Sequence, residues 1–503
     1  MTQGVLPFQY EVSASACGMT ALAGLPAYLD LAAVSGLTGA IRRHLKVSGE
    51  RQGWTDEQVV MSLVLLNLAG GDCVDDLRVL EGDEGFARVL RRVELHGHKR
   101  KERRALERRW RKARRRAVPS PSAVFRYLQA FHDGEEEAKR VAGRAFIPAP
   151  TEALKALYRV NQELVAFKQA KAPQRIATLD MDATLVETHK RLALFCYQGY
   201  AAYQPLTLYW QEQRVVLHSE FRDGNVPAGY ELQRVLGQSL EALPEGVERV
   251  RLRSDTAGYD HRLLRFCAEG GARLGVIEFA IGVDVTAAFK AAVAAVSEWR
   301  PLCREVDGRR EATGQEWAEV CFVPAWAATK KDGPSYRFLA IREPLEQTEL
   351  PGMDPAQLPF PTMLFEESRY KVFGVVTNRM APGEEVIHWH RERCGKSEAA
   401  HGVMKSDLAG GQMPSALFGV NAAWWAIVVL AFNLNALMTH LVLPEGWADK
   451  RFKALRFSFI SVAGRVFGHA RRLIVRLSEG HPASALLIEV RSRILGLAPV
   501  PTG

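Results

Sequence analysis

Two aspartates stand one residue apart at the end of a short apolar run, and this spacing is typical of metal chemistry. Asp180 and Asp182 lie near the end of the segment 176–184, whose other residues are mostly apolar. Such a run predicts a buried strand with carboxylates at its C-terminal end, where ligands and catalytic groups collect in open α/β sheets. Carboxylates are ligands that Mg²⁺ prefers, so this strand end predicts a metal site.

Two further acids occupy comparable settings downstream. Asp255 ends the alternating run 250–255, which predicts a second strand, and Glu398 lies on a helix predicted within 388–398. If separate elements bring these acids together, two metal ions could bind the attacking and leaving oxygens of a phosphodiester. Taken singly, each acid is better explained by a surface position or a helix cap.

Length and composition favour a cytoplasmic protein of several domains. The 503 residues are too many for one core, and a hydrophobic content of 47% suffices to bury two to four. The seven cysteines are scattered without a Cys-x-x-Cys pair, and no signal peptide is predicted at the N-terminus, so we expect a reducing cytoplasm. The most membrane-like segment, 422–434, is shorter than the ~20 residues of a span and predicts a buried core helix.

Residues 1–150 are predicted to form a helical region for DNA binding or dimerisation. A capping box of Thr55 and Gln58 marks one helix start. Basic residues crowd the segment 98–116, which could neutralise several phosphates but could equally be a solvated helix face or linker. A helix at 123–131, with Arg126 and Tyr127 expected to be exposed, is suited to a DNA groove. Within the basic segment, the candidate DNA-binding residues are Arg108, Arg109, Arg111 and Lys112.

The remaining elements predict an α/β fold with a mixed sheet. Residues 151–282 give the order β-β-β-α-β-α-β after an initial helix, with a hairpin around 211–213, and this order is found in ribonuclease H-like folds. Residues 283–365 predict a β-rich insertion, and 366–440 return to the first layer. Residues 441–503 predict a C-terminal helical tail that includes a basic stretch at 465–476.

Several motifs resemble those of one enzyme family. The segments 179–184, 253–259 and 393–398, the last followed by His401 and Lys405, are similar to DDE transposases of the bacterial IS1380-like group, whose catalytic domain is ribonuclease H-like. The resemblance covers most of the chain, because it continues through three further segments, 66–72, 119–126 and 418–425.

The resemblance implies roles for individual acids. It makes Asp255 the second catalytic acid and Glu398 the third, and all three acids would hold Mg²⁺, with Mn²⁺ as the alternative. The first acid is either Asp180 or Asp182. Asp182 is favoured as the direct metal ligand because the family's first acid commonly precedes a small residue and a Thr or Ser, as Asp182 does here.

The resemblance also implies partners and a mechanism. Arg393 and Lys405 are assigned to DNA phosphates near the cut, and strands of the insertion to the DNA of the element's ends. Water would nick double-stranded DNA at the terminal inverted repeats, and the freed 3′-hydroxyl would attack target DNA. Joining two ends favours a homodimer, and the location implied is the bacterial nucleoid, without a membrane.

Two other functions fit parts of the sequence. Asp180-x-Asp182 also matches the first motif of haloacid-dehalogenase-like phosphatases, in which the first Asp attacks phosphorus and the second is a general acid/base. That interpretation leaves the basic segment and the Glu398 region unexplained. The other alternative is a DNA-binding protein whose catalytic domain is degenerate.

Overall fold

The computed structural model describes residues 18–48, 53–96, 98–105, 116–270, 273–326, 336–345, 358 and 360–498. These residues belong to two compact units that alternate along the sequence. Unit 1 comprises Met1–Glu135, Ala149–Phe167 and Val403–Gly503, and unit 2 comprises Glu136–Pro148 and Lys168–Gly402. The predicted acids Asp180, Asp182, Asp255 and Glu398 all belong to unit 2.

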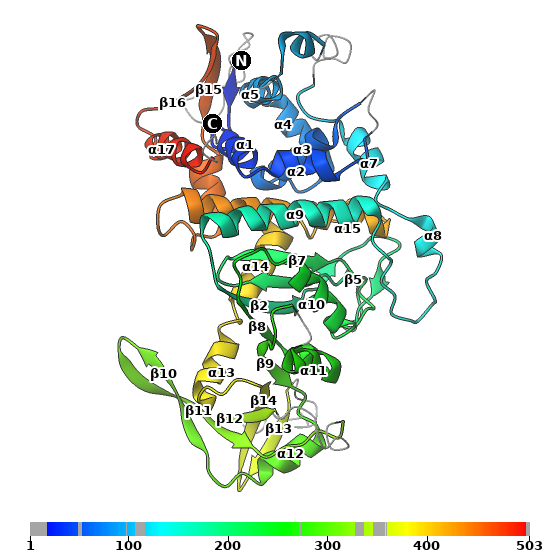
Figure 1. Ribbon diagram of the computed structural model, residues 1–503, viewed down its shortest axis with the longest axis vertical. Coiled ribbons are helices and arrows are strands. Elements are labelled where there is room, and N and C mark those ends of the chain that lie inside the picture. Colours follow the sequence, from blue (N-terminus) through cyan, green and yellow to red (C-terminus); the bar gives the residue numbers. More distant parts are fainter. Residues whose placement is uncertain are drawn as a thin grey trace, which may run out of the picture. The chain divides into compact units, whose positions relative to one another are not determined.

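A ten-stranded mixed sheet forms the framework of unit 2 (Figure 1). Half of it has the order β9-β8-β2-β6-β7, in which β2, β8 and β9 are parallel and β6 and β7 form an antiparallel hairpin. Helices α10 and α11 connect β7 to β8 and β8 to β9, so the predicted order β-β-β-α-β-α-β is confirmed for the strands of this sheet. The bounds are β2 Ile176–Ala183, β6 Leu206–Trp210, β7 Val215–Glu220, α10 Leu232–Glu241, β8 Arg249–Ser254, α11 His261–Glu269 and β9 Glu278–Val283.

Burial explains why β2 is central. Its residues from Ala177 to Met181 are all buried, as expected for a strand with parallel and antiparallel neighbours and both faces covered. Only the last two residues, Asp182 and Ala183, reach intermediate exposure. The strand therefore delivers one carboxylate into the core, at Asp180, and one to the edge of the sheet, at Asp182.

The predicted β-rich insertion continues the same sheet. The strand β14 pairs with β9 in antiparallel fashion, and β12, β11 and β10 follow in turn, while β13 pairs with the other part of β14. The helix α12 precedes these strands. Their bounds are α12 Ala287–Ala294, β10 Arg300–Val306, β11 Arg309–Val320, β12 Arg337–Pro344, β13 Thr362–Phe365 and β14 Ser368–Thr377.

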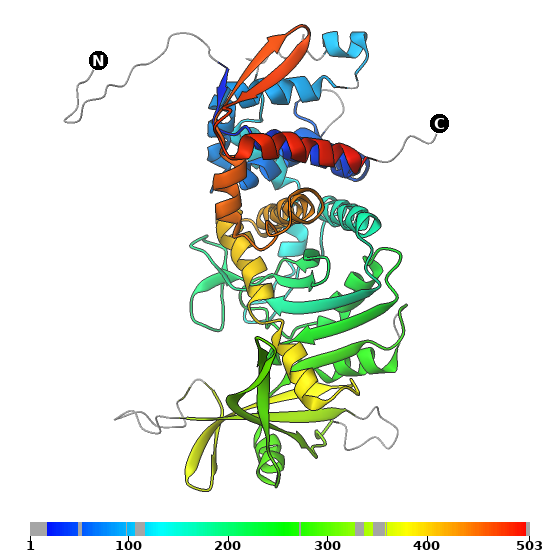
Figure 2. The ribbon, with the colours of Figure 1, turned by 90° about the vertical axis from the view of Figure 1, so that its left-hand side faces the viewer.

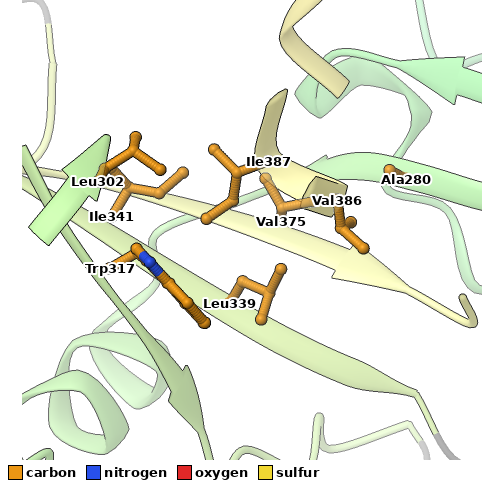
Figure 3. Packing of buried hydrophobic residues seen from close by; sticks show 8 residues of the cluster. All are labelled: Ala280, Leu302, Trp317, Leu339, Ile341, Val375, Val386 and Ile387. Carbon is orange, nitrogen blue, oxygen red and sulfur yellow. The ribbon is translucent and has the colours of Figure 1, made fainter. Parts of the chain in front are cut away.

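A hydrophobic cluster fastens α13 (Gly383–Arg391) to this part of the sheet (Figure 3). Gly383 permits the close approach, since a Cβ atom there would lie 2.3 Å from the Trp317 ring. This packing fixes the position of α13, and the chain continues from its C-terminal end into α14 (Lys396–Gly402). The cluster consists of Ala280, Leu302, Trp317, Leu339, Ile341, Val375, Val386 and Ile387.

Unit 2 also contains short elements that connect the strands. A three-stranded sheet of order β3-β5-β4 lies between β2 and β6 in sequence, and the 3₁₀ turn η2 follows β8. Helix α8 is divided between the two units, with two residues in each, and the long helix α9 begins in unit 1 and ends in unit 2. The bounds are β3 Val186–Glu187, β4 Leu194–Phe195, β5 Ala201–Tyr203, η2 Thr256–Gly258, α8 Gly134–Glu137 and α9 Glu152–Lys171.

Unit 1 is built from helices around the apolar helix α15. The predicted capping box at Thr55 is confirmed, because the Gln58 amide N–H donates to its Oγ1 and the Thr55 N–H donates to the Gln58 side chain. The helical bounds are α1 Leu25–Val34, α2 Leu37–His44, α3 Asp56–Ala69, η1 Val74–Asp76, α4 Leu77–Gly82, α5 Glu84–Glu94, α7 Pro121–Gln129, η4 Val403–Asp407, α15 Phe418–Leu437, η5 Met438–Val442, α16 Phe452–Leu455, η6 Arg456–Ile460 and α17 Ala483–Gly496.

Helix α15 is the predicted core helix. The stretch Phe418–Val442 is long and apolar enough to cross a membrane, but 83% of its apolar window is buried inside the protein. The polar Asn433 side chain on it is also satisfied internally, since its amide donates to Asn161 at 2.7 Å. Both observations favour a core helix.

Two sequence predictions for unit 1 are wrong. The basic stretch 465–476 is not helical: β15 (Gly464–His469) and β16 (Arg472–Leu477) form a hairpin, and β15 also pairs with β1 (Met19–Thr20). Alternating and β-branched residues there favour a strand over a helix. Tyr127 on α7 is buried rather than exposed, and its ring packs against Phe131 with centroids 5.6 Å apart.

Candidate active site

Asp182 lies near the end of β2, and Asp255 directly follows the end of the adjacent parallel strand β8. The last paired residues of β2 and β8 are Met181 and Ser254, so the two aspartates come next in register. Burial raises the pKa of Asp182 to about 6; the Arg393 guanidinium opposes this shift, and the Asp255 carboxylate adds to it. The Asp182 side chain is 15% exposed and Asp255 is half-buried. Two carboxylates thus meet in a partly desolvated place where both charges together are unfavourable.

The turn η2 positions Asp255. One carboxylate oxygen of Asp255 accepts a hydrogen bond from the Ala257 N–H at 3.0 Å, which caps the turn. The turn lies close to β9, because a Cβ atom on Gly282 would be 2.9 Å from the Thr256 nitrogen and 3.1 Å from the Asp255 carbonyl carbon. Asp255 can therefore occupy this position because Gly282 has no side chain.

Asp180 has a different environment from Asp182. It is fully buried, and both of its oxygens accept from the buried Arg253 guanidinium, at 2.6 and 2.9 Å. The same guanidinium donates to the Trp389 carbonyl oxygen at 2.8 Å and lies 3.3 Å from Glu392. Burial raises the pKa of Asp180, and the paired Arg253 acts in the opposite direction. One ion pair thus joins β2, β8 and the C-terminal end of α13.

Three side chains from the α13–α14 segment face Asp182. The Arg393 guanidinium lies 3.5 Å from its carboxylate, and the His401 Nδ1 lies 3.8 Å away. The Ser397 hydroxyl donates to it at 3.4 Å. Ser397 and His401 are four residues apart on α14, which places them on one helix face, and Arg393 lies in the turn that precedes this helix. They provide one cation, one hydroxyl and one titratable ring beside the acid.

His390 anchors the end of α13 beside Asp255. Its Nε2 lies 2.9 Å from the Ser254 carbonyl oxygen. Burial lowers the pKa of His390 to about 4, so the ring is neutral at pH 7 and donates to this carbonyl. A hydrogen bond from an uncharged ring therefore holds the backbone immediately before Asp255. His390 adds no charge beside the acids and Arg393.

The structure does not group Glu398 with the two aspartates. Glu398 is exposed on α14, and within the described ranges no three His, Cys, Asp or Glu side chains lie close enough together to hold a metal ion. Gly395, with φ of 83°, lies between α13 and α14. Glu398 directly follows Ser397 on α14, so it points to a different side of the helix from Ser397 and His401.

The predicted DNA-binding residues lie in several places. Arg393 is buried against Asp182 and is not on the surface, whereas Arg126 is exposed on α7. Lys405 is half-buried in the π-helical segment η4 of unit 1. The remaining four, Arg108, Arg109, Arg111 and Lys112, lie outside the described residues.

Sequence reasoning assigned no role to Arg253, Ser397, His401 or His390. A signal for Arg253 was present, because a charged residue at a buried strand position needs an opposite charge and Asp180 also lies on a buried strand. The four-residue steps from Arg393 to His401 were a second signal. The parallel register of β2 and β8, which was required to combine these signals, is not readable from one sequence.

The donor set fits a hard divalent cation. Asp182 and Asp255 supply carboxylate oxygens, and Mg²⁺ is commonly held by one or two carboxylates together with waters and phosphate oxygens. Burial is the main cause of the raised pKa of Asp182; Arg393 acts against this shift, and the Asp255 carboxylate adds to it. A bound cation would relieve the repulsion between the two carboxylates.

The same geometry argues against a phosphatase of the haloacid-dehalogenase type. The first aspartate of that motif must reach phosphorus as a nucleophile. Here Asp180 has no exposed side-chain surface, and Arg253 occupies both of its oxygens. Asp180 is therefore placed as a structural partner of Arg253, not as a nucleophile.

The sequence matches the family described as Transposase DDE domain group 1 over residues 8–324 and 365–499. The chain therefore belongs to this family of DDE transposases. Among solved structures, a cryo-EM structure of the piggyBac transposase synaptic complex with hairpin DNA is similar. It shows 11% identity and a TM-score of 0.44, with 95% of this chain and 86% of that chain covered. No curated protein matches the chain.

The Asp180–Arg253 pair generates a test of stability. Asp180→Ala leaves the buried Arg253 guanidinium without its main partner and should cost about 3–5 kcal/mol of unfolding free energy. A double variant, Asp180→Leu with Arg253→Met, removes both charges at similar volume and should cost much less. Denaturant titration followed by tryptophan fluorescence measures both. Equal losses in the two variants would contradict this role for the pair.

Gly282 generates a test of site geometry. Gly282→Ala places a Cβ atom against the backbone of Asp255 and Thr256 and should weaken metal binding roughly 10–100-fold, in the range seen when supporting groups around a metal site are changed. The measurement is the rise in melting temperature on titration with Mn²⁺. Gly237→Ala is the matched control, since a Cβ atom there meets nothing within 4 Å and helix α10 favours alanine. Equal metal responses in both variants would refute the role given to Gly282.

Proposed function

We propose that the protein is a transposase of the IS1380-like group, which binds the terminal inverted repeats of an insertion sequence, cleaves the ends and transfers 3′-hydroxyl strands to target DNA. The observation that carries this proposal is the meeting of Asp182 and Asp255 at the ends of two parallel strands, with an unfavourable mutual charge. Family membership supplies the substrate class, which is DNA.

Asp182, Asp255 and Glu398 are the proposed metal ligands and catalytic acids, and Mg²⁺ or Mn²⁺ the proposed cofactor. When bound, the metal would activate the attacking oxygen and stabilise the leaving oxygen of the phosphodiester. Asp180 is proposed to act through Arg253 by fixing the position of β2. Glu398 comes from the resemblance, and its exposed place on α14, one residue after Ser397, leaves it accessible to incoming ligands.

The residues around Asp182 have roles in this proposal. Arg393 and Ser397 orient the Asp182 carboxylate through contacts of 3.5 and 3.4 Å. Arg393 also limits the repulsion between the two aspartates before a cation arrives. The His401 Nδ1 lies 3.8 Å from the same carboxylate, and the ring adds a positive charge beside it when it is protonated. These contacts keep a single carboxylate arrangement ready for the metal.

The fold supports a ribonuclease H-like catalytic domain. The order β7-β6-β2-β8-β9, with the first three strands antiparallel and the last two parallel to β2, is the arrangement expected from the predicted β-β-β-α-β-α-β sequence. We propose that residues 151–282 and 366–440 form this domain, with the β-rich insertion at 283–365. The helical region 1–150 and the tail 441–503 complete the proposed division.

We propose further DNA contacts by residues outside the site. The basic segment with Arg108, Arg109, Arg111 and Lys112, together with Arg126 and Lys405, would contact phosphates of the transposon ends and of target DNA. A homodimer in the cytoplasm, associated with the nucleoid, would bring two ends together. DNA binding alone, without cleavage, is the competing function.

The catalytic proposal predicts which variants lose cleavage. Asp182→Asn, Asp255→Asn and Glu398→Ala should each lower metal-dependent nicking of inverted-repeat DNA by at least about 10³-fold while DNA binding persists, because each removes transition-state charge stabilisation. Nicking is followed on gels with duplexes taken from the regions that flank the gene. Glu245→Gln, in the loop that precedes β8, is the control.

Full cleavage by the Asp182 and Asp255 variants would overturn the assignment of these acids. Binding without metal-dependent cleavage in the wild-type protein would favour the degenerate, DNA-binding alternative. Loss of cleavage in the aspartate variants but not in Glu398→Ala would remove Glu398 alone from the proposed site.

The pKa of Asp182 predicts a pH dependence of stability. Its folded-state pKa of about 6 lies above the unfolded value of ~3.9, so the folded state binds more protons between these values. Its contribution is therefore fully present below pH ~4 and lost as pH rises through 6, to the extent of roughly 2–3 kcal/mol. Mg²⁺ should restore stability above pH 6.

Denaturant titrations of wild type and Asp182→Asn between pH 4 and 8 measure this effect. The difference in unfolding free energy between the two proteins should change across this range in metal-free buffer. A constant difference would contradict the electrostatic description of the site.

A further inference from the structure

The β15–β16 hairpin of unit 1 is strongly basic. Its residues 464–477 include Arg465, Arg471, Arg472 and Arg476 and no acidic residue. The hairpin is drawn as a two-stranded ribbon in orange-red in Figure 2. Such a ribbon has the dimensions that the DNA major groove admits. Its charges belong to a segment that sequence analysis had assigned to a helical tail.

The register places the charges on one face. Arg465 pairs with Arg476, and His469 pairs with Arg472. Because side chains alternate along a strand, these four residues share a face with the central pair Phe467 and Ile474. All four are exposed. Arg465 and Arg476 lie directly opposite each other, so this face carries two positive charges at neighbouring positions.

The opposite face of the hairpin packs on unit 1. Val466 is fully buried, and its carbonyl oxygen accepts from the Arg88 guanidinium of α5 at 3.1 Å. Arg92, also on α5, donates to the Arg471 carbonyl oxygen at 3.0 Å. The hairpin is therefore held by its apolar face and its tip, and the basic face is left to solvent.

The turn of the hairpin is strained. Ala470 and Arg471 have φ of 45° and 64°, in the left-handed region that favours Gly or Asn in such turns. A side chain with a Cβ atom costs energy there, and such strain persists mainly where function requires it. The arginine side chain is thus retained at the tip although glycine would fit the backbone better.

In the parts of the chain that the structure describes, Arg471, Arg472 and Arg476 form no ion pair. The Arg476 guanidinium instead lies over the Phe467 ring, 4.5 Å from its centroid, which holds an exposed cation in place. A row of fixed, exposed cations is complementary to a polyanion.

We propose that the basic face of the β15–β16 hairpin binds the sugar-phosphate backbone of double-stranded DNA at the transposon end. This inference rests on the proposed function and adds a DNA-contacting element to it. Phosphate contacts carry affinity and little sequence information, so the hairpin contributes to both specific and non-specific binding.

The experiment compares full-length variants in fluorescence anisotropy with duplexes from the element's ends and with an unrelated duplex, at several salt concentrations. Arg471→Gly should weaken binding to both duplexes by about fivefold to tenfold at 0.1 M salt and lower the salt slope by about one. It should also raise the melting temperature by about 1–2 °C, because glycine relieves the strained turn. The double variant Arg472→Gln with Arg476→Gln should lower the slope by about two.

Two matched controls isolate the charge. Ala470→Gly relieves the same turn without removing a cation, so it should raise stability and leave DNA binding unchanged. Arg249→Gln removes an exposed cation at the start of β8, the end of the strand opposite Asp255, and should also leave the salt slope unchanged.

The outcomes separate the two proposals. If the wild-type protein binds its end DNA and the hairpin variants bind with the same affinity and slope, the hairpin proposal is overturned and the proposed function stands. If the wild-type protein neither binds nor cleaves end DNA, the proposed function fails. Loss of binding to anionic lipid vesicles in the variants, with DNA binding unaltered, would assign the hairpin to a membrane surface and also overturn the proposal.

Discussion

The buried ion pair between Asp180 and Arg253 is the interaction on which the site depends. Removing two charges from water is costly and is repaid only when hydrogen bonds satisfy both groups. Here Arg253 binds both Asp180 oxygens and the Trp389 carbonyl oxygen, so β2, β8 and α13 share one satisfied centre. Asp182 lies two residues after Asp180 in β2, and Asp255 lies two residues after Arg253, directly after β8. The pair therefore sets the register in which the two acids meet.

The site combines rigid support with unfavourable charge. His390 holds the backbone before Asp255, and the packing of α13 on the extended sheet brings the segment containing Arg393 to Asp182. Within this frame burial raises the pKa of Asp182, and the neighbouring Asp255 carboxylate adds to this shift. Such a shift is common at functional sites, where the surrounding structure maintains an arrangement that a ligand later stabilises.

The sequence predicted much of the fold because the strands have distinct patterns. The run before Asp180 and the alternation before Asp255 identified β2 and β8, and the order of elements in unit 2 followed. Long-range register decided the rest. Arg253 acquires its role only because β8 lies beside β2. Glu398 lies outside the acidic group, and Gly395, with its positive φ, interrupts the predicted helix before it. The sequence pattern did not predict where this interruption falls.

The errors in unit 1 have similar causes. The basic residues of 465–476 obscured an alternating pattern, and Arg471 occupies a turn position that normally signals itself by glycine or asparagine. Tyr127 was expected on the surface of a DNA-binding helix, but its ring packs against Phe131. In each case one local property of a residue was outweighed by its tertiary neighbours.

Anomalous scattering from crystals grown with Mn²⁺ tests the central claim most directly, because it locates the metal independently of activity. The account predicts a peak between the Asp182 and Asp255 carboxylates, with the Asp180–Arg253 pair unchanged beside it. A metal bound by Asp180, with Arg253 displaced, or a peak away from both Asp182 and Asp255 would contradict it.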